Sequence, residues 1–79
     1  METTVASNQT LDARGLNCPL PILRTKKSLG ALQSGDTLKV VATDPGSLKD
    51  MQAFCTQTGN TLLSSAQQGN DYEFLIRKA

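Results

Sequence analysis

The stretch T-L-K-V-V-A-T at residues 37–43 decides how this 79-residue chain folds. Every second residue in it is apolar and would lie on one side of a strand: Leu38, Val40 and Ala42. Asp44 and Pro45 follow at once, and an N-cap residue followed by proline is a start signal for a helix. We therefore predict a strand over 37–43 that leads directly into a helix.

The C-terminal half continues with this helix and a hairpin. The helix should end near Thr58, because Gly59 suits the left-handed conformation in which many helices stop. Its apolar stripe comprises Leu48, Met51, Cys55 and Thr58, with Phe54 beside it. Two further strands are predicted over 60–67 and 71–78, joined by a short loop at 68–70.

The N-terminal half repeats the pattern of strand and helix. Residues 11–13 alternate as a short strand does, and residues 14–17 form a turn. Pro19 favours a helix that begins there, because its fixed φ suits the first helical position. Cys18 would then be the N-cap, and Pro21 would fall at the third helical position, inside the first turn. The helix should end near residue 32, with Ile22, Leu23, Leu29 and Leu32 as its apolar stripe.

The order of these elements, β-α-β-α-β-β, predicts an α/β two-layer sandwich. Helical crossovers followed by a terminal hairpin favour a four-stranded mixed sheet with both helices on one face. The length leaves room for one hydrophobic core, so we expect a single domain over 9–79. Residues 1–8 hold no apolar run and are predicted to be a flexible tail.

The composition argues against several classes of function. A formal net charge of +1 and only three aromatic residues disfavour direct binding of nucleic acid. Two cysteines without any histidine cannot supply the four ligands of a structural zinc site, so we expect neither a metal nor a cofactor. The sequence shows no signal peptide or membrane span, and we expect a cytoplasmic monomer.

The pattern Cys18-Pro19-Leu20-Pro21 carries the most chemistry in the chain. A helix N-terminus stabilises a thiolate, which is the nucleophilic form of cysteine. The backbone N–H of Leu20 is expected to point at the sulfur, while Pro19 and Pro21 stiffen the first helical turn. The alternative is that Cys18 only caps the helix, but cysteine is a poor residue for that purpose.

Neighbouring side chains add to this site. Arg14 is four residues from Cys18 across the turn and is the candidate to stabilise its thiolate, with Asn17 as a supporting turn residue. Positive charges continue along the predicted helix at Arg24, Lys26 and Lys27. They would form either a solvated face or a docking surface for acidic partners.

Several blocks of this sequence resemble the TusA (SirA/YedF) family of sulfur carriers. The similarity is carried by L-D-A-R-G-L-N-C-P-L-P-I-L at 11–23, V-A-T-D-P-G-S-L-K-D at 41–50, A-F-C at 53–55 and G-N-T-L-L at 59–63. The resemblance covers roughly residues 9–78, and the family fold has the same order of elements.

The resemblance implies a function as a sulfurtransferase-type persulfide carrier. Cys18 would accept sulfane sulfur from a cysteine desulfurase or a rhodanese-like donor and pass it to a downstream acceptor protein. Typical destinations in the family are tRNA thiolation, molybdenum cofactor synthesis and sulfur oxidation. Whether such a carrier counts as an enzyme is left open.

Two alternatives remain open from the sequence. A thiol redox protein would pair Cys18 with Cys55, whereas a non-catalytic regulatory or RNA-binding module would not need the Cys18 thiol. Cys55 lies on the apolar stripe of its helix, where a free cysteine usually acts as a small hydrophobic residue. We therefore expect Cys55 to pack in the core, with a resolving or accessory role in sulfur chemistry as the alternative.

Overall fold

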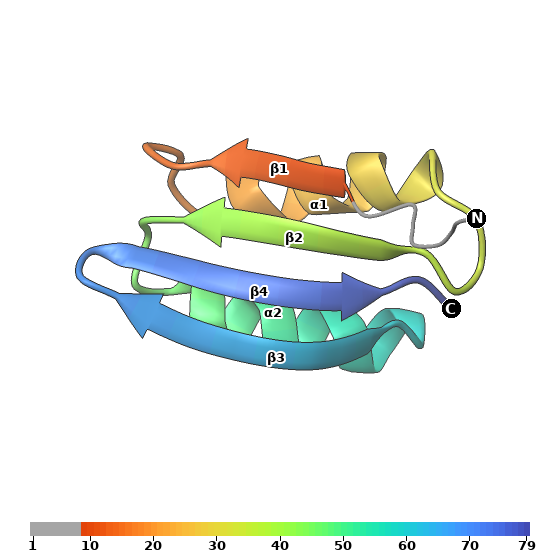
Figure 1. Ribbon diagram of the computed structural model, residues 1–79. Helices are drawn as coiled ribbons and strands as arrows, with labels where there is room; N and C mark the ends of the chain where they lie inside the picture. Colours follow the sequence, from red (N-terminus) through yellow and green to blue (C-terminus); the bar gives the residue numbers. More distant parts are fainter. Residues whose placement is uncertain (1–8) are drawn as a thin grey trace.

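The computed structural model describes residues 9–79, and the tail expected over 1–8 lies outside this range. The elements are β1 (Gln9–Ala13), α1 (Leu20–Gly30), β2 (Thr37–Ala42), α2 (Ser47–Thr58), β3 (Thr61–Gln68) and β4 (Asp71–Arg77). The sheet order is β1-β2-β4-β3; β1 and β2 run parallel, and the other two pairs are antiparallel. Figure 1 shows both helices on one face of this sheet. The predicted α/β sandwich with a mixed sheet is confirmed.

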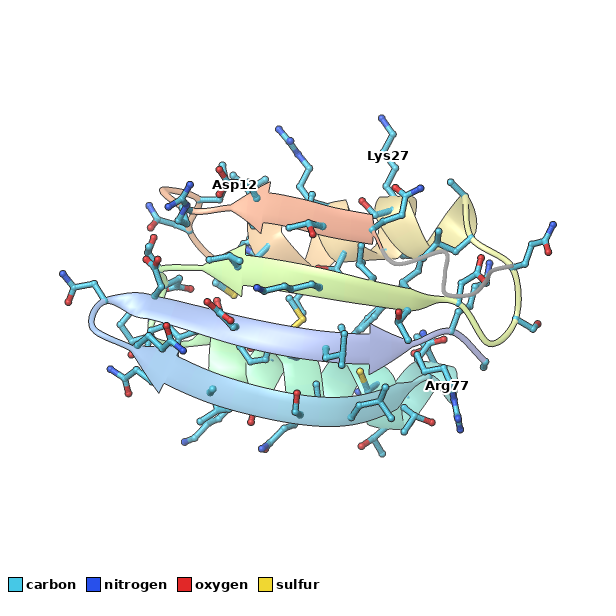
Figure 2. All side chains as sticks on the ribbon, viewed as in Figure 1. Asp12, Lys27 and Arg77 are labelled. Atoms are coloured by element: carbon cyan, nitrogen blue, oxygen red, sulfur yellow. The ribbon has the colours of Figure 1, made fainter. Side chains whose placement is uncertain are left out.

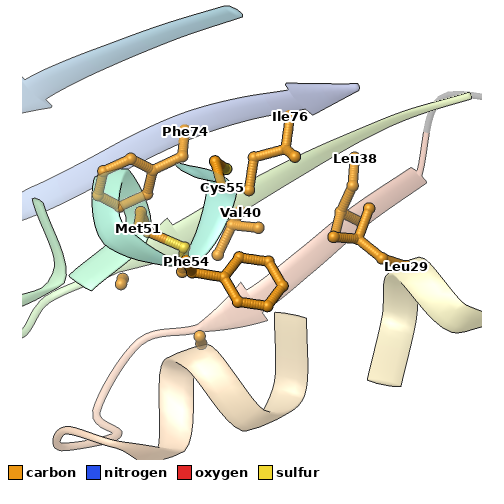
Figure 3. Close-up of a cluster of buried hydrophobic side chains, with 10 residues drawn as sticks. Leu29, Leu38, Val40, Met51, Phe54, Cys55, Phe74 and Ile76 are labelled. Carbon is orange, nitrogen blue, oxygen red and sulfur yellow. The ribbon is translucent and has the colours of Figure 1, made fainter. Parts of the chain in front are cut away.

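The core lies between the sheet and the two helices. From β2, alternate residues Leu38, Val40 and Ala42 are fully buried, as the strand pattern predicted. The register places Val40 opposite Phe74 and Leu38 opposite Ile76 on β4, so that large side chains meet in pairs on the covered face. Helix α2 adds Met51, Phe54 and Cys55 to the same cluster (Figure 3).

Both helices begin later than the sequence predicts. Helix α1 starts at Leu20 with Pro19 as its N-cap, so Cys18 lies one residue outside the cap and Pro21 is the second helical residue. Helix α2 starts at Ser47 instead of Pro45. The Asp44 carbonyl oxygen accepts a hydrogen bond from the Ser47 N–H at 2.9 Å, so residues 44–47 form a turn before the helix proper.

The buried faces of the helices also differ from the predicted stripes. On α1, Pro21, Thr25 and Leu29 are buried, whereas Leu23 is 54% exposed. Thr25 is accommodated because its hydroxyl donates a 2.7 Å hydrogen bond to the Pro21 carbonyl oxygen. The prediction that Leu23 belongs to the buried stripe is therefore wrong, because the buried face of α1 contains Thr25 instead. On α2, Met51 and Cys55 are buried, but Leu48 and Thr58 are exposed.

The remaining boundaries lie close to their predicted positions. Helix α1 ends at Gly30, about two residues before the predicted end, and the hairpin loop contains only Gly69 and Asn70. Gly59 adopts φ +80° and closes α2 as expected. Within residues 9–79, neither helix is long and apolar enough to cross a membrane.

Candidate functional site

Cys18 lies in the loop between β1 and α1 and is exposed to solvent. The turn before the helix is held by hydrogen bonds from the Leu20 N–H to the Asn17 carbonyl oxygen at 2.8 Å and from the Leu23 N–H to the Pro19 carbonyl oxygen at 3.1 Å. The Leu20 N–H is therefore already bonded within the turn. The expectation that this N–H points at the sulfur is wrong.

Two aspartates that are distant in sequence lie next to Cys18. Because β1 and β2 are parallel, the loops after Ala13 and Ala42 leave the same end of the sheet side by side (Figure 1). The Cys18 N–H donates a 3.1 Å hydrogen bond to Oδ2 of Asp44, 26 residues further on. The Cys18 sulfur and carboxylate oxygens of Asp44 and Asp50 all lie within 4.8 Å of one another.

These carboxylates make the thiol harder to ionise. The pKa of Cys18 is raised above its ordinary value, first by the hydrogen bond of its thiol to Asp50. Partial desolvation and the negative charges of Asp50 and then Asp44 act in the same direction. A helix N-terminus alone would lower this pKa, so the sequence prediction of a stabilised thiolate is wrong for the free protein.

Arg14 belongs to a different group of charges. Its Nε lies 2.9 Å from Oδ1 of Asp12, and its Nη1 lies 4.0 Å from Oδ2 of Asp71. Hydrogen bonds to the Arg14 side chain and backbone lower the pKa of Asp12 to about 2. The guanidinium is thus directed to the carboxylates of Asp12 and Asp71. The sequence predicted that Arg14 acts on the Cys18 thiol, but the charged groups that shift its pKa are Asp50 and Asp44.

An open groove between α1 and α2 begins beside Cys18. Its volume is about 230 Å³, and its lining comprises Cys18, Pro19, Ile22, Asp50, Ala53, Phe54 and Gln57. Figure 3 shows Phe54 extending from α2 toward α1, where it forms part of the floor. The exposed Cys18 therefore has an adjacent surface that is largely apolar, with the Asp50 carboxylate at the end beside the sulfur.

The basic residues predicted for docking remain accessible. Arg24, Lys26 and Lys27 are all exposed on α1, and Figure 2 shows Lys27 extending away from the body of the molecule. Leu20, at the tip of the same helix, is 44% exposed. This geometry leaves them free to contact a partner.

The cysteine and the two aspartates are close enough to share a metal ion. They would offer one soft thiolate and two hard carboxylates, a donor set that matches no single preferred metal well. The chain contains no histidine that could add an imidazole ligand to these three groups. We assign no metal to this cluster.

Cys55 packs in the core, as predicted. Its side chain is 4% exposed, and burial raises the pKa of its thiol. A buried, protonated thiol is a poor partner for disulfide exchange, which argues against the redox pair with Cys18.

Sequence reasoning missed the roles of Asp44 and Asp50. Asp44 was interpreted as a helix-start residue, because aspartate is common at that position. The available signal was topological: the helix-start residues that follow two adjacent parallel strands lie at the same sheet edge.

Three comparisons place this geometry among known proteins. The family model described as sulfurtransferase TusA matches residues 9–78. The sulfur carrier protein TusA of Allochromatium vinosum is 60% identical over 72 residues, covering 91% of this chain and 95% of that protein. The crystal structure of a SirA-like protein from Desulfitobacterium hafniense is similar with a TM-score of 0.77 at 27% identity, covering 87% of this chain and 95% of the other.

Proposed function

Because the chain belongs to the family of the sulfurtransferase TusA and is a sulfur carrier, we propose that it carries the sulfur as a persulfide on Cys18. The observation that supports this assignment is the contrast between the two cysteines. Cys18 is exposed in the loop just before α1, whereas Cys55 is buried among core side chains. A group that must be handed to another protein needs an accessible sulfur, and only Cys18 offers one.

The proposed transfer exchanges one sulfur–sulfur bond for another. The Cys18 thiolate attacks the outer sulfur of the donor's persulfide, a new bond forms to Cys18, and the donor's thiolate leaves. An acceptor thiolate then attacks the outer sulfur on Cys18, and the Cys18 thiolate is released. Each step conserves charge and needs no general base from this chain, which has no histidine.

The partners are proposed by class. A cysteine desulfurase or a rhodanese-like protein would supply the sulfur, and a downstream acceptor protein would receive it. Thiolation of tRNA, synthesis of the molybdenum cofactor and sulfur oxidation all consume sulfur in this form. We further propose that the carrier acts as a monomer in the cytoplasm, where reducing conditions keep thiols free.

Intact mass spectrometry after incubation with a desulfurase and cysteine tests this function. The parent protein should gain the mass of one sulfur atom, and a reductant should remove it. Cys18→Ser should gain none, because the accepting thiolate is missing. A Cys18→Ser protein that gains labile sulfur as the parent does would contradict the assignment, and a parent that gains none would favour a non-catalytic role.

Cys55→Ala is the matched control for this experiment. It should load sulfur as the parent does but lose about 1 kcal/mol of unfolding free energy in urea, because a buried side chain leaves a small cavity. A Cys55→Ala protein of unchanged stability that fails to load sulfur would place Cys55 in the chemistry.

A further inference from the structure

The carboxylates beside Cys18 lack a cationic partner among residues 9–79. The ion pairs in this part of the chain involve Asp12, Asp71 and Glu73, and neither Asp44 nor Asp50 takes part in one. One carboxylate oxygen of Asp44 accepts the Cys18 N–H, and a carboxylate oxygen of Asp50 lies within 4.8 Å of the Cys18 sulfur. Two half-buried negative charges thus flank a surface thiol without a countercharge from the described fold.

This arrangement opposes the chemistry that the site performs. The thiolate that the donor releases and the thiolate with which the acceptor attacks are both anions when sulfur is transferred. Each of these species must come within bonding distance of Cys18, whose sulfur lies within 4.8 Å of both carboxylates. A partner that brings only its reactive sulfur would be repelled, so the productive complex needs a positive charge at this position.

The groove indicates where the rest of the partner lies. It leads from Cys18 along the contact between α1 and α2, and Ile22, Ala53 and Phe54 give it an apolar lining. Figure 1 shows both helices on one face of the sheet, and the groove that Cys18 lines lies between them on this covered side. A segment that lies in the groove therefore contacts apolar surface along its length and the Asp50 carboxylate at the end next to Cys18.

We propose that the groove between α1 and α2 docks the cysteine-bearing segment of the sulfur-transfer partner, with an arginine or lysine of that segment against the carboxylates of Asp50 and Asp44. An apolar side chain of the same segment packs over Ile22 and Ala53. This inference rests on the proposed function of Cys18 and names the chemistry of the partner that the site accepts.

Docking of this kind couples recognition to reactivity. In the free carrier the carboxylates raise the pKa of the Cys18 thiol and so disfavour the thiolate, which limits its reaction with other electrophiles. A cation placed between the carboxylates offsets their charge and favours the thiolate when the partner's sulfur is in place. Asp50 and Asp44 act here as recognition and positioning residues, since the bonds that form and break join sulfur atoms only.

A pair of short peptides tests the charge preference. Acetyl-Leu-Arg-Cys-amide and acetyl-Leu-Glu-Cys-amide are each prepared as the mixed disulfide with 2-thiopyridine. The Cys18 thiolate attacks the peptide sulfur, forms the Cys18–peptide disulfide and releases 2-thiopyridone, whose absorbance gives the rate. At low salt the parent should react about tenfold faster with the arginine peptide, a ratio expected for one charge contact near a protein surface.

Variants then assign this preference to the carboxylates. Asp50→Asn should reduce the ratio to about threefold, because one of two charges is removed at nearly constant shape. Glu73→Gln is the matched control: it makes the same change in net charge on β4, where Glu73 pairs with Lys39 at 3.5 Å on the uncovered face of the sheet. Its ratio should equal that of the parent. If Asp50→Asn does not fold, Asp44→Asn must give the reduction, since asparagine can still accept the Cys18 N–H.

A third peptide tests the apolar contact. Replacing leucine by glycine in the arginine peptide should slow the parent about threefold, as expected for loss of one partly buried aliphatic side chain. Ala53→Gln should remove this difference, because the longer side chain fills the groove at an exposed position. Equal rates for the leucine and glycine peptides on the parent would remove the groove from the proposal.

The outcomes separate this inference from the function on which it rests. Suppose that the parent loads sulfur on Cys18 but has the same ratio of arginine-peptide to glutamate-peptide rates as Asp50→Asn. This result would support the proposed function and contradict the proposed docking mode. An equal reduction in Glu73→Gln would also overturn it, because the effect would then follow net charge. A parent that loads no sulfur contradicts the proposed function, whatever the peptides show.

Discussion

At Cys18 the immediate neighbours, not the helix end, set the properties of the thiol. The N-terminus of α1 should favour a thiolate, but Cys18 lies outside its N-cap and next to two carboxylates. Full charges at such distances outweigh the partial charge of a helix terminus, which falls off within one turn. In the free protein, the pKa of the Cys18 thiol therefore lies above its ordinary value.

Replacing the Asp50 carboxylate by an amide should change the rate at which Cys18 is alkylated. The carboxylate raises the pKa of Cys18, so Asp50→Asn should lower that pKa and enlarge the thiolate fraction at pH 7. We expect iodoacetamide to alkylate Cys18 at least about twofold faster in the variant. The two rates should converge as the pH rises past both pKa values, where each protein is fully ionised. A variant that is alkylated no faster at pH 7 would show that Asp50 does not govern the thiol.

At the scale of elements, the parallel pair β1–β2 builds the site. It brings the loop before α1 and the loop before α2 to one edge, and the bond from Cys18 N–H to Asp44 ties the two loops together. Neither loop alone holds both the thiol and its carboxylates. The position of Cys18 thus depends on pairing between residues far apart in the chain.

Removing this tie should loosen the first loop. Asp44→Ala eliminates the acceptor of the Cys18 N–H and should cost about 1 kcal/mol in urea unfolding. Hydrogen exchange of the Cys18 amide, followed by NMR, should accelerate, because its proton would be bonded only to water. Asp44→Asn should preserve the protection, since its side-chain oxygen accepts the same bond. Fast exchange in the parent itself would contradict the tether.

Much of this architecture is predictable from sequence, and the reasons for the failures are physical. The alternation in β2 and the glycine at 59 depend on local geometry, which the sequence displays directly. Leu23 was misplaced because a threonine that bonds its own helix can occupy a buried position as well as a leucine can. Asp44 was misassigned because a helix cap and an acceptor for a distant backbone N–H require the same kind of side chain. Only the pairing of β1 with β2, which brings Cys18 next to Asp44, distinguishes the two roles.

On the scale of the whole molecule, charge is separated although the net charge is only +1. The carboxylates lie at the end of the helical layer where α1 and α2 begin, while Arg24, Lys26 and Lys27 extend along α1. A partner that approaches Cys18 meets both regions. Its encounter can therefore be steered by α1 before the groove is occupied.

Charge reversal on α1 tests this steering. Lys26→Glu with Lys27→Glu should slow sulfur transfer from a protein donor, because the on-rate depends on long-range attraction. Its alkylation by iodoacetamide should match that of the parent, since neither lysine contacts Cys18. Raising the salt toward about 0.5 M should slow the parent in a similar way, because the Debye length then falls to a few ångströms. Equal transfer rates for both proteins at low salt would remove the basic residues from the docking step.

The exposure of Cys18 has a cost that the two aspartates reduce. A sulfur carried in the open can leak to any small thiol in its surroundings, and abundant cellular thiols such as glutathione bear a net negative charge. The carboxylates beside Cys18 repel such scavengers by the same charge that a cationic partner neutralises. In the proposed function, the site would thus act as an electrostatic filter, which protects a persulfide on Cys18 during diffusion between proteins and releases it to a cationic partner.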